Sequence, residues 1–323
     1  MKAIITGGAG FIGSAIAEHL LANGFSVTII DNLTRNSIQY NQSLLHNSRL
    51  TFNQVDICDQ AALMALDNDF THIFHLAAIA GVSKYFSAPA DVMRINTLGT
   101  FNMLEVAKKQ HSLRLFVDFS TSEIYGSFCH NVSEDGDIKM ECLSEKRWTY
   151  ASSKIASERF VMSYYWQYDV PVSIVRPFNI YGPGQTGEGV ISNFIINSLH
   201  NKPIVVTGNG EQLRSFCFID DMVRGLSLIL DQILEDSDKV IGEAYNIGND
   251  ADIITMNSLA KLVRHLTHSS SEIVHRRHLG ADVIVRSPNI SKLRKLTYHP
   301  QVSLEEGIAR SVAWYQENIL ETL

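Results

Sequence analysis

Two short stretches of the sequence gather side chains that could take part in proton transfer. In the first, residues 148–160 read "WTYASSKIASERF", and helical spacing places Tyr150 and Lys154 one turn apart on the same face. Tyrosine, with an ordinary pKa of about 10, is a poor base at neutral pH, but a nearby ammonium group stabilises the phenolate and lowers that pKa. Tyr150 could therefore accept a proton from a hydroxyl group, although a tyrosine and a lysine at this spacing also occur simply as neighbours on a helix.

The second stretch, "FSTSEIYGSF" at residues 119–128, follows an apolar run and carries hydroxyl, carboxylate and phenol side chains in consecutive positions. Thr121, Ser122 and Glu123 lie just beyond the expected end of a strand. Ligands of open parallel sheets bind outside the carboxyl ends of the strands. These side chains are therefore candidates for chemistry, with the capping of a turn as the alternative.

A glycine-rich turn precedes both stretches. In "TGGAGFIG", Gly7, Gly10 and Gly13 follow a strand pattern directly and open a helix pattern. Glycine allows the tight turn and the close approach of a pyrophosphate, and the helix N-terminus supplies N–H donors to the anion. Asp31 ends the next strand pattern, where a carboxylate can accept the ribose hydroxyls of a dinucleotide. An acid there repels a 2′-phosphate and favours NAD, while Arg35 leaves NADP as an alternative.

Short apolar runs alternate with helix-like segments, which predicts βαβ units and a parallel sheet buried on both faces. We therefore expect an α/β fold, a doubly wound parallel (Rossmann) sheet with a smaller C-terminal substrate-binding lobe. Residues 1–178 are expected to form the NAD-binding Rossmann domain, completed by parts of 217–248, and residues 179–323 mainly the smaller lobe. The strand-like runs are residues 2–6, 26–30, 50–56, 72–78, 114–120 and 171–178.

Composition narrows the class of protein. The 323 residues carry a formal net charge of −7, which weighs against a nucleic-acid partner, and no run is long and apolar enough for a membrane span. The four cysteines lack CxxC spacing, which favours a reducing, cytoplasmic location over a disulfide framework. No metal site is expected, because His265, His268, His275 and His278 are not accompanied by ligands at recognisable spacing.

Several motifs occur in the order found in extended short-chain dehydrogenases/reductases. More narrowly, the chain resembles the NAD-dependent nucleotide-sugar epimerase/dehydratase family, and the similarity continues through residues 208–225 and 290–308. The motifs are the glycine turn, Asp31, "HLAA" (75–78), "STSEIYG" (120–126), "YASSK" (150–154) and "RPFNIYGP" (176–183).

The resemblance implies specific roles for the candidate residues. Thr121 would hydrogen-bond the oxygen on C4 of the sugar, Tyr150 would be the base, and Lys154 would lower the tyrosine pKa and bind the nicotinamide ribose. Enzymes of this family oxidise C4 of a nucleotide-diphosphate sugar, with NAD as a tightly held catalyst. The implied cofactor contacts are Gly7, Gly10, Phe11, Ile12, Gly13, Asp31, Asn32, Asp56, Ile57, Leu76, Ala77, Ala78, Tyr150, Lys154 and Pro177. Asp56 could instead cap the following helix.

The resemblance also implies contacts with the substrate. Arg214 would bind the diphosphate, or alternatively pair with an acid such as Asp220. The other implied substrate contacts are Lys84, Asn179, Asn193 and Arg277.

Ser122 and Glu123 bear on the second half of the reaction. Relatives that only epimerise C4 usually have a small or hydroxyl residue in place of Glu123, and 4,6-dehydratases usually have Asp in place of Ser122. The triplet at residues 121–123 is most similar to that of UDP-glucuronate decarboxylases, although these usually have an arginine where this chain has Gly184, a charge that Lys84 could replace. Decarboxylation is the leading hypothesis, with C4 epimerisation and 4,6-dehydration as alternatives and a non-catalytic NAD-binding module as the rival class.

Relatives also often dimerise through the helix that carries the tyrosine and the helix near residues 96–109. The resemblance therefore implies a homodimer.

Overall fold

Seven parallel strands form the central sheet of the computed structural model, which describes residues 1–187, 189–277 and 280–319. The strand order is β12-β7-β5-β4-β1-β2-β3, with all neighbours parallel. The strands are β1 (Lys2–Thr6), β2 (Ser26–Asp31), β3 (Leu50–Gln54), β4 (His72–His75), β5 (Leu115–Phe119), β7 (Val172–Pro177) and β12 (Glu243–Ile247). All six predicted strands are present, and β12 joins the sheet from the later part of the chain.

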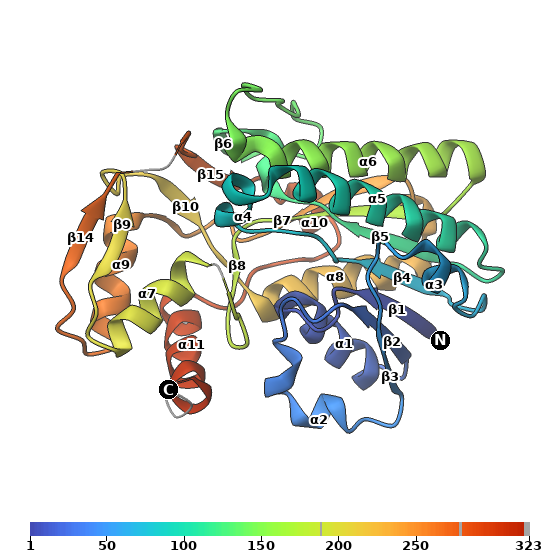
Figure 1. The fold of residues 1–323 in the computed structure, drawn as a ribbon, viewed down its shortest axis with the longest axis horizontal. Coiled ribbons are helices and arrows are strands. Elements are labelled where there is room, and N and C mark those ends of the chain that lie inside the picture. The colour runs from blue at the N-terminus through green and yellow to red at the C-terminus, as the bar shows by residue number, and fades with distance from the viewer. Residues whose placement is uncertain (188, 278–279, 320–323) are drawn as a thin grey trace.

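Helices cover both faces of this sheet (Figure 1). α1 (Phe11–Ala22) and α8 (Ile219–Glu235) pack on the side to which Ile5 points, and α5 (Pro89–Lys108) and α6 (Thr149–Tyr168) on the side to which Ile4 points. Because successive strand residues point to opposite faces, both Ile4 and Ile5 are fully buried. The predicted fold class, a doubly wound Rossmann sheet with a smaller lobe, is confirmed.

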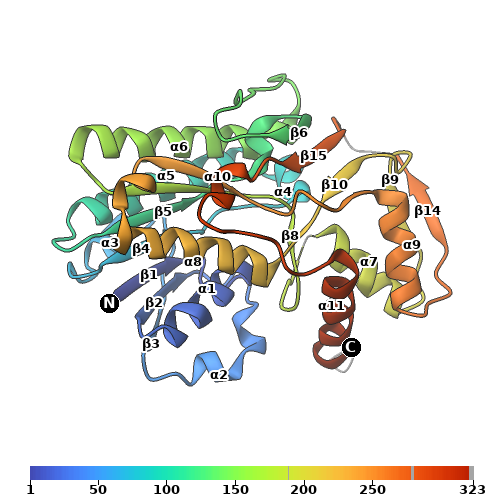
Figure 2. The same ribbon diagram turned by 180° about the vertical axis from the view of Figure 1, so that it is seen from behind.

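Short elements connect these layers. They are η1 (Ile38–Tyr40), α2 (Gln42–Leu45), α3 (Gln60–Met64), α4 (Val82–Ser87), η2 (Ser122–Tyr125), η3 (Lys146–Trp148), η4 (Ser237–Lys239) and α10 (Ser291–Arg294). Figure 2 shows α8 and α10 from the side opposite to that of Figure 1.

The smaller lobe lies beside the carboxyl ends of the strands (Figure 1). Its largest sheet has the order β13-β10-β15-β6, and β9 and β14 form a separate pair. The strand β6 (Phe128–Val132) comes from the first half of the chain, so the two lobes exchange segments. The other elements are β8 (Ile180–Tyr181), α7 (Val190–Leu199), β9 (Ile204–Thr207), β10 (Leu213–Ser215), β11 (Cys217–Phe218), β13 (Ile253–Thr255), α9 (Met256–Leu266), β14 (Ile273–Arg276), β15 (Val285–Pro288) and α11 (Leu304–Asn318).

Among the described residues, no helix is both long enough and apolar enough to cross a lipid bilayer.

Candidate active site

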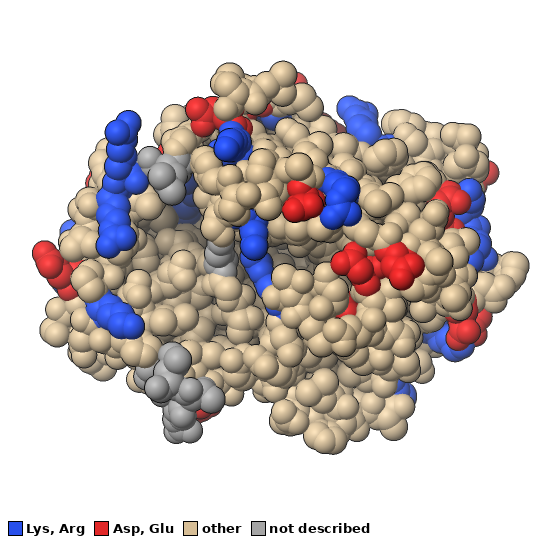
Figure 3. Space-filling view, viewed as in Figure 1, with Lys and Arg blue, Asp and Glu red and all other residues tan. Residues whose placement is uncertain are grey.

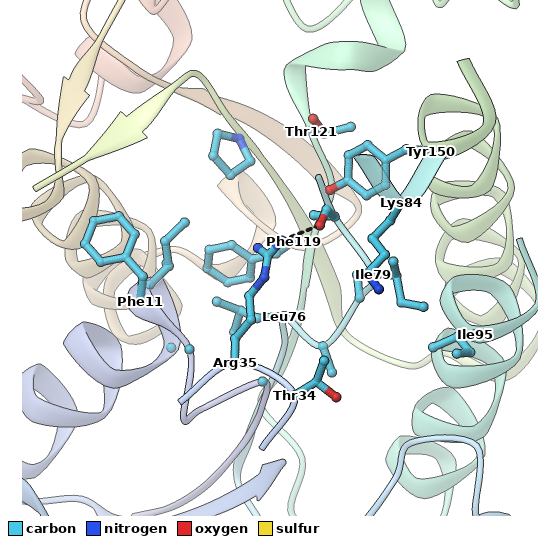
Figure 4. A pocket seen from close by; sticks show the side chains of 18 of the residues that line it. Phe11, Thr34, Arg35, Leu76, Ile79, Lys84, Ile95, Phe119, Thr121 and Tyr150 are labelled. Atoms are coloured by element: carbon cyan, nitrogen blue, oxygen red, sulfur yellow. Dashed lines mark hydrogen bonds between the residues drawn. The ribbon is translucent and has the colours of Figure 1, made fainter. Parts of the chain in front are cut away.

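A cavity of about 650 Å³ lies at the carboxyl ends of the central strands. Its lining comes from the turn between β1 and α1, the ends of β2, β4 and β5, the residue Tyr150 of α6, and the segment after β7. Figure 4 shows Phe11 and Leu76 on one side of this space and Tyr150 and Thr121 on the other. In the space-filling view, Lys and Arg side chains lie at the hollow near the centre of the face (Figure 3).

The glycine turn forms a cradle that larger residues would fill. Gly7 has a φ of 70°, and a Cβ there would lie 2.8 Å from the backbone nitrogen of Ala77. A Cβ on Gly13 would collide with the Gly7 carbonyl. Gly10 is the N-cap of α1 and has no side chain to compete for the helix N–H groups. The turn therefore fits a pyrophosphate, as a dinucleotide cofactor requires.

Asp31 ends β2 and lines the cavity beyond the glycine turn. Its carboxylate accepts hydrogen bonds from the backbone nitrogens of Ala9 at 3.0 Å and Leu33 at 2.8 Å. Burial raises the pKa of the Asp31 carboxyl, and these backbone N–H groups oppose the shift. An acid fixed at this point fits NAD better than a 2′-phosphorylated cofactor.

The side chains of Asn32 and Asp56 are hydrogen-bonded to each other at the edge of the cavity. Asn32 Nδ2 donates to Asp56 Oδ2 at 3.1 Å, and the backbone nitrogen of Cys58 donates to Asp56 Oδ1 at 2.8 Å. The Cys58 hydrogen bond helps to hold the pKa of Asp56 below its ordinary value. Asn32 and Ile57 line the cavity, whereas the side chain that caps α3 belongs to Asp59 and not to Asp56.

Tyr150 and Lys154 share one face of α6, as their spacing predicted, and both are buried. The Tyr150 ring stacks on Tyr85, with the ring centroids 5.2 Å apart and the planes within 5°. Burial raises the pKa of Tyr150, Glu123 and Asp118 act in the same direction, and a hydrogen bond to Thr121 lowers it. The expected lowering of the tyrosine pKa is therefore not what the structure shows, because burial and two carboxylates outweigh the groups that favour phenolate.

Thr121 connects the end of β5 to η2. Its Oγ1 accepts the backbone N–H of Glu123 at 3.2 Å, so the threonine caps the turn and also faces the cavity. Ser122 is buried and lines the cavity too. Capping and a role in the site are therefore compatible, since Thr121 caps the turn through its oxygen and is hydrogen-bonded to Tyr150 at the cavity.

Glu123 is held in a buried ion pair. Arg147 binds both carboxylate oxygens, with Nη1 2.7 Å from Oε2 and Nη2 2.9 Å from Oε1, and Arg286 Nη1 lies 3.6 Å from Oε1. Burial acts to raise the pKa of Glu123, but the two arginines outweigh it, so the pKa lies below its ordinary value. A carboxylate held in this way stays ionised and is a weak base.

Arg286 has donors left over. Its guanidinium is buried and lines the cavity, yet within the described part of the chain its Nε and Nη2 have no hydrogen-bond partner. Buried polar groups are normally hydrogen-bonded, so two free N–H positions on a buried cation indicate a place for an anionic group of a ligand.

Only some of the predicted substrate residues line the cavity. Lys84 and Asn179 line the cavity, and Asn179 Nδ2 donates to the Ser215 carbonyl at 2.8 Å. Asn193 and Arg277 are exposed and are not among the cavity's lining residues.

Arg214 does not pair with Asp220, which instead pairs with Arg310 at 2.7 Å. Its Nη2 donates to the Val283 carbonyl at 2.5 Å and lies 3.6 Å from Asp282 Oδ1. The acid near Arg214 is therefore Asp282 and not Asp220, and the diphosphate role of Arg214 stays a prediction.

All of the predicted cofactor residues except Asp56 and Lys154 line the cavity. β4 ends at His75, so the chain leaves the sheet one residue before the cavity. The lining includes Gly7, Gly10, Phe11, Ile12, Gly13, Asp31, Asn32, Ile57, Leu76, Ala77, Ala78, Tyr150 and Pro177.

Arg35 extends across the cavity. Its Nη2 donates to the Ala80 carbonyl at 2.5 Å, as the dashed line in Figure 4 shows. Nearby, Ser37 Oγ and Thr186 Oγ1 are 2.7 Å apart, which joins the loop after β2 to the segment after β8. These two contacts close one side of the cavity.

The sequence analysis assigned no role to three charged residues at or near the cavity, Arg147, Asp118 and Arg286. Arg147 precedes the tyrosine by three residues in "KRWTY", and Asp118 interrupts the apolar run "LFVDF"; both were visible signals. Arg286 had no such signal, because its chain segment reaches the site only through the pairing of β15 with β6.

No group of three or more His, Cys, Asp or Glu side chains within residues 1–187, 189–277 and 280–319 is arranged to hold a metal ion. His278 lies outside the described residues. All four cysteines are free thiols.

A glycine cradle with an acid beyond it, facing a tyrosine–lysine pair, defines a nucleotide-dependent redox enzyme, and comparison with known proteins agrees. The sequence pattern of the NAD dependent epimerase/dehydratase family matches residues 3–248. The chain belongs to this family; it is an enzyme, and its cofactor is NAD. The alternative of a non-catalytic NAD-binding module is therefore set aside.

Three relatives illustrate the similarity. UDP-N-acetyl-alpha-D-glucosaminuronate decarboxylase of Bacillus cytotoxicus is 36% identical, with 98% of each chain covered. UDP-glucuronic acid decarboxylase 1 of Arabidopsis thaliana is 32% identical, covering 99% of this chain and 71% of its own. The crystal structure of UDP-glucuronic acid 4-epimerase from Bacillus cereus, in complex with UDP-glucuronic acid and NAD, superposes with a TM-score of 0.89 at 30% identity, covering 98% of this chain and 99% of the other.

Proposed function

We propose that this enzyme oxidises C4 of a UDP-linked hexuronate and releases the C6 carboxyl group as CO2, as a UDP-glucuronate decarboxylase-like enzyme. The observation that carries the proposal is the buried guanidinium of Arg286, whose Nε and Nη2 have no partner in the described structure. A sugar carboxylate would supply the missing acceptors. The two relatives named as decarboxylases act on nucleotide-linked uronates, which is consistent with such a substrate.

The charges around Glu123 support an anionic sugar. Three cations interact electrostatically with one another and with two carboxylates here. The cations are Arg147, Arg214 and Arg286, and the carboxylates are Glu123 and Asp282. The cluster has a net charge of +1 from these five groups. A neutral hexose would leave this excess buried without compensation, whereas a hexuronate would balance it.

The residues of the site can support the reaction. NAD, when bound, would accept the hydride from C4 and later return it. Tyr150 would accept the proton of the C4 hydroxyl, with Thr121 donating to the C4 oxygen. In the resulting 4-keto sugar the C5–C6 bond breaks, its electron pair enters the enolate between C5 and the C4 oxygen, and C6 leaves as CO2. The enolate then takes a proton at C5.

Dehydration fits these residues less well. It requires a base for the C5 proton and an acid for the departing 6-hydroxyl. Glu123 is committed to Arg147, and Ser122, a much weaker acid than Asp, stands at the position expected for the acid. Decarboxylation needs no base at C5, because the departing CO2 leaves the C5–C6 bonding pair behind and no C5 proton is removed.

C4 epimerisation of a hexuronate is the second candidate function. The free donors of Arg286 would serve such a substrate equally well, and the Bacillus cereus 4-epimerase has nearly the same fold. Both reactions pass through a 4-keto sugar. Decarboxylation removes its carboxylate, whereas epimerisation keeps the carboxylate and requires the hydride to return to the opposite face of C4.

The other residue roles are part of the same proposal. Gly7, Gly10 and Gly13 would hold the pyrophosphate of NAD, Asp31 the adenosine ribose, and Lys154 the nicotinamide ribose. The domain division is also proposed, with residues 1–178 and β12 binding NAD and most of 179–323 binding the nucleotide sugar. Lys84, Asn179, Asn193, Arg214 and Arg277 are retained as proposed substrate contacts, of which only Lys84 and Asn179 line the cavity.

We further propose a cytoplasmic homodimer. Leu98 of α5 and Phe160 and Trp166 of α6 are exposed, and α5 and α6 pack side by side on the same face of the sheet. A second copy placing the same helices against this apolar surface would cover it. Four free cysteines are consistent with a reducing compartment.

Incubating the purified enzyme with a panel of nucleotide sugars, followed by mass spectrometry, tests the proposed reaction. UDP-glucuronate or its 2-acetamido analogue should lose the mass of CO2, while UDP-glucose and dTDP-glucose should remain unchanged. Loss of water from dTDP-glucose would establish a dehydratase instead. An unchanged mass with a new NMR coupling pattern in a hexuronate would establish the epimerase.

A further inference from the structure

Asp118 is a buried acid in the middle of the central strand β5. Its neighbours in that strand, Phe116, Val117 and Phe119, are apolar and buried, as expected for a central parallel strand. The Asp118 side chain is fully buried, and neither carboxylate oxygen has a hydrogen-bond partner in the described part of the chain. A buried carboxylate without hydrogen bonds is costly, so its place in the molecule requires an explanation.

Within the described part of the chain, the cation paired with Asp118 is Lys154. Lys154 Nζ lies 3.9 Å from Asp118 Oδ1, and both side chains are almost wholly excluded from solvent. Lys154 lies one turn from Tyr150 on the same face of α6. In the proposed function, its ammonium group is the cation that stabilises the phenolate of this tyrosine. Two anions, the carboxylate and a phenolate, would therefore compete for one buried positive charge.

The other charged groups around this pair are already committed. Glu158, one turn further along α6, forms a two-point ion pair with Arg176 of β7, at 3.0 and 2.8 Å. His75, opposite Asp118 on β4, is hydrogen-bonded to Thr6 at 2.8 Å and Thr100 at 3.1 Å. Burial lowers the pKa of His75 to about 3, so it stays neutral. Asp118 is therefore the titrating group next to Lys154.

We propose that Asp118 is a positioning residue for Lys154, and that its charge competes with the Tyr150 phenolate for the lysine and thereby sets the pH range in which Tyr150 acts as a base. When Asp118 is ionised, part of the Lys154 charge is neutralised and Tyr150 holds its proton more tightly. When Asp118 is neutral, the full charge of Lys154 favours the phenolate. The inference rests on the proposed roles of Tyr150 and Lys154.

The direction of the pKa shifts agrees with this geometry. Burial raises the pKa of Asp118 to about 6, with Lys154 opposing the shift and Glu158 adding to it. Burial raises the pKa of Tyr150, the negative charges of Glu123 and then Asp118 add to the shift, and Thr121 and Arg35 oppose it. Ionisation of Asp118 therefore takes place just below neutral pH, where it can affect the enzyme.

The test is a spectroscopic titration of Tyr150 in the full-length, NAD-loaded protein. Phenolate absorbance in the near ultraviolet is measured against pH for the wild type and for Asp118→Asn, each with the Tyr150→Phe counterpart subtracted to isolate this tyrosine. A nearby like charge commonly shifts a pKa by about one unit or more. Tyr150 should therefore ionise about one unit lower in Asp118→Asn, and the acidic limb of the pH–rate profile should move the same way.

The control variant Asp238→Asn removes an exposed carboxylate in η4 and should shift neither curve. If Asp118→Asn does not fold, Asp118→Val removes the same charge with a side chain suited to an apolar strand. Coincident titration curves for the wild type and the Asp118 variant, or a shift to higher pH, would overturn the inference. The titration requires no turnover. It can therefore be interpreted even if the enzyme proves not to decarboxylate its substrate.

Discussion

The ion pair between Glu123 and Arg147 makes a quantitative prediction about stability. Glu123→Gln keeps the size of the side chain but removes the charge, so Arg147 is left buried beside a neutral amide. The two side chains are only 12% and 7% exposed, and the pair is held by two hydrogen bonds. Breaking a buried pair from one side costs roughly 3–5 kcal/mol, and because Gln still accepts one hydrogen bond we expect a loss of about 3 kcal/mol.

Urea unfolding at neutral pH, followed by fluorescence, measures this loss as a lower midpoint. The double variant Glu123→Gln/Arg147→Met should recover part of the stability, because no charge then remains unpaired between the two positions. The matched control is Glu272→Gln, an exposed glutamate whose replacement should change the midpoint little. A loss below about 1 kcal/mol for Glu123→Gln, as for a surface pair, would refute the reasoning.

The same pair predicts a pH dependence. The pKa of Glu123 is lowered in the folded protein, so its stabilising contribution is present above the unfolded value of about 4.3 and is lost as pH falls through the lower folded value. The stability difference between wild type and Glu123→Gln should accordingly be largest at neutral pH and shrink below about pH 4. A difference that grows on acidification would contradict the assigned direction.

Three further substitutions test individual side chains. Arg286→Leu should lower kcat/KM for a UDP-hexuronate by about 10- to 100-fold, the effect of losing a charge-assisted hydrogen bond, while affinity for UDP itself stays within about twofold. Tyr150→Phe should reduce turnover by at least about 100-fold in steady-state assays without releasing NAD, because it removes the proton acceptor and keeps the ring that stacks on Tyr85. Arg35→Ala should speed the release of NAD in stopped-flow exchange, because the contact with Ala80 that closes the cavity is lost, whereas the exposed Arg264→Ala should not.

Local sequence patterns predicted the sheet and the glycine turn well. Alternating apolar runs located six of the seven strands of the central sheet, and the turn at residues 7–13 has the strand before it and the helix after it that its spacing demands. Tyr150 and Lys154 are one helical turn apart, so their common face followed from periodicity alone. These features depend on residues close together in the chain.

The electrostatics of the site could not be predicted in the same way. Glu123 meets Arg147 only because η3 is packed against α4 and α6, and it meets Arg286 only through the strand pairing of β15. The donors of Arg214 are partly used by carbonyls of residues 283 and 284, which a one-dimensional pattern does not reveal. The pKa of Tyr150 depends on its burial and on carboxylates from other segments of the chain, so it could not be predicted without the folded structure.

The most direct test of the account is the product formed from a UDP-hexuronate in D2O. Loss of CO2 creates an enolate that must take a proton from solvent at C5, so decarboxylation predicts a pentose product that lacks C6 and carries one deuterium at C5 by NMR and mass spectrometry. A product that keeps its carboxylate and carries no deuterium would contradict decarboxylation and establish C4 epimerisation.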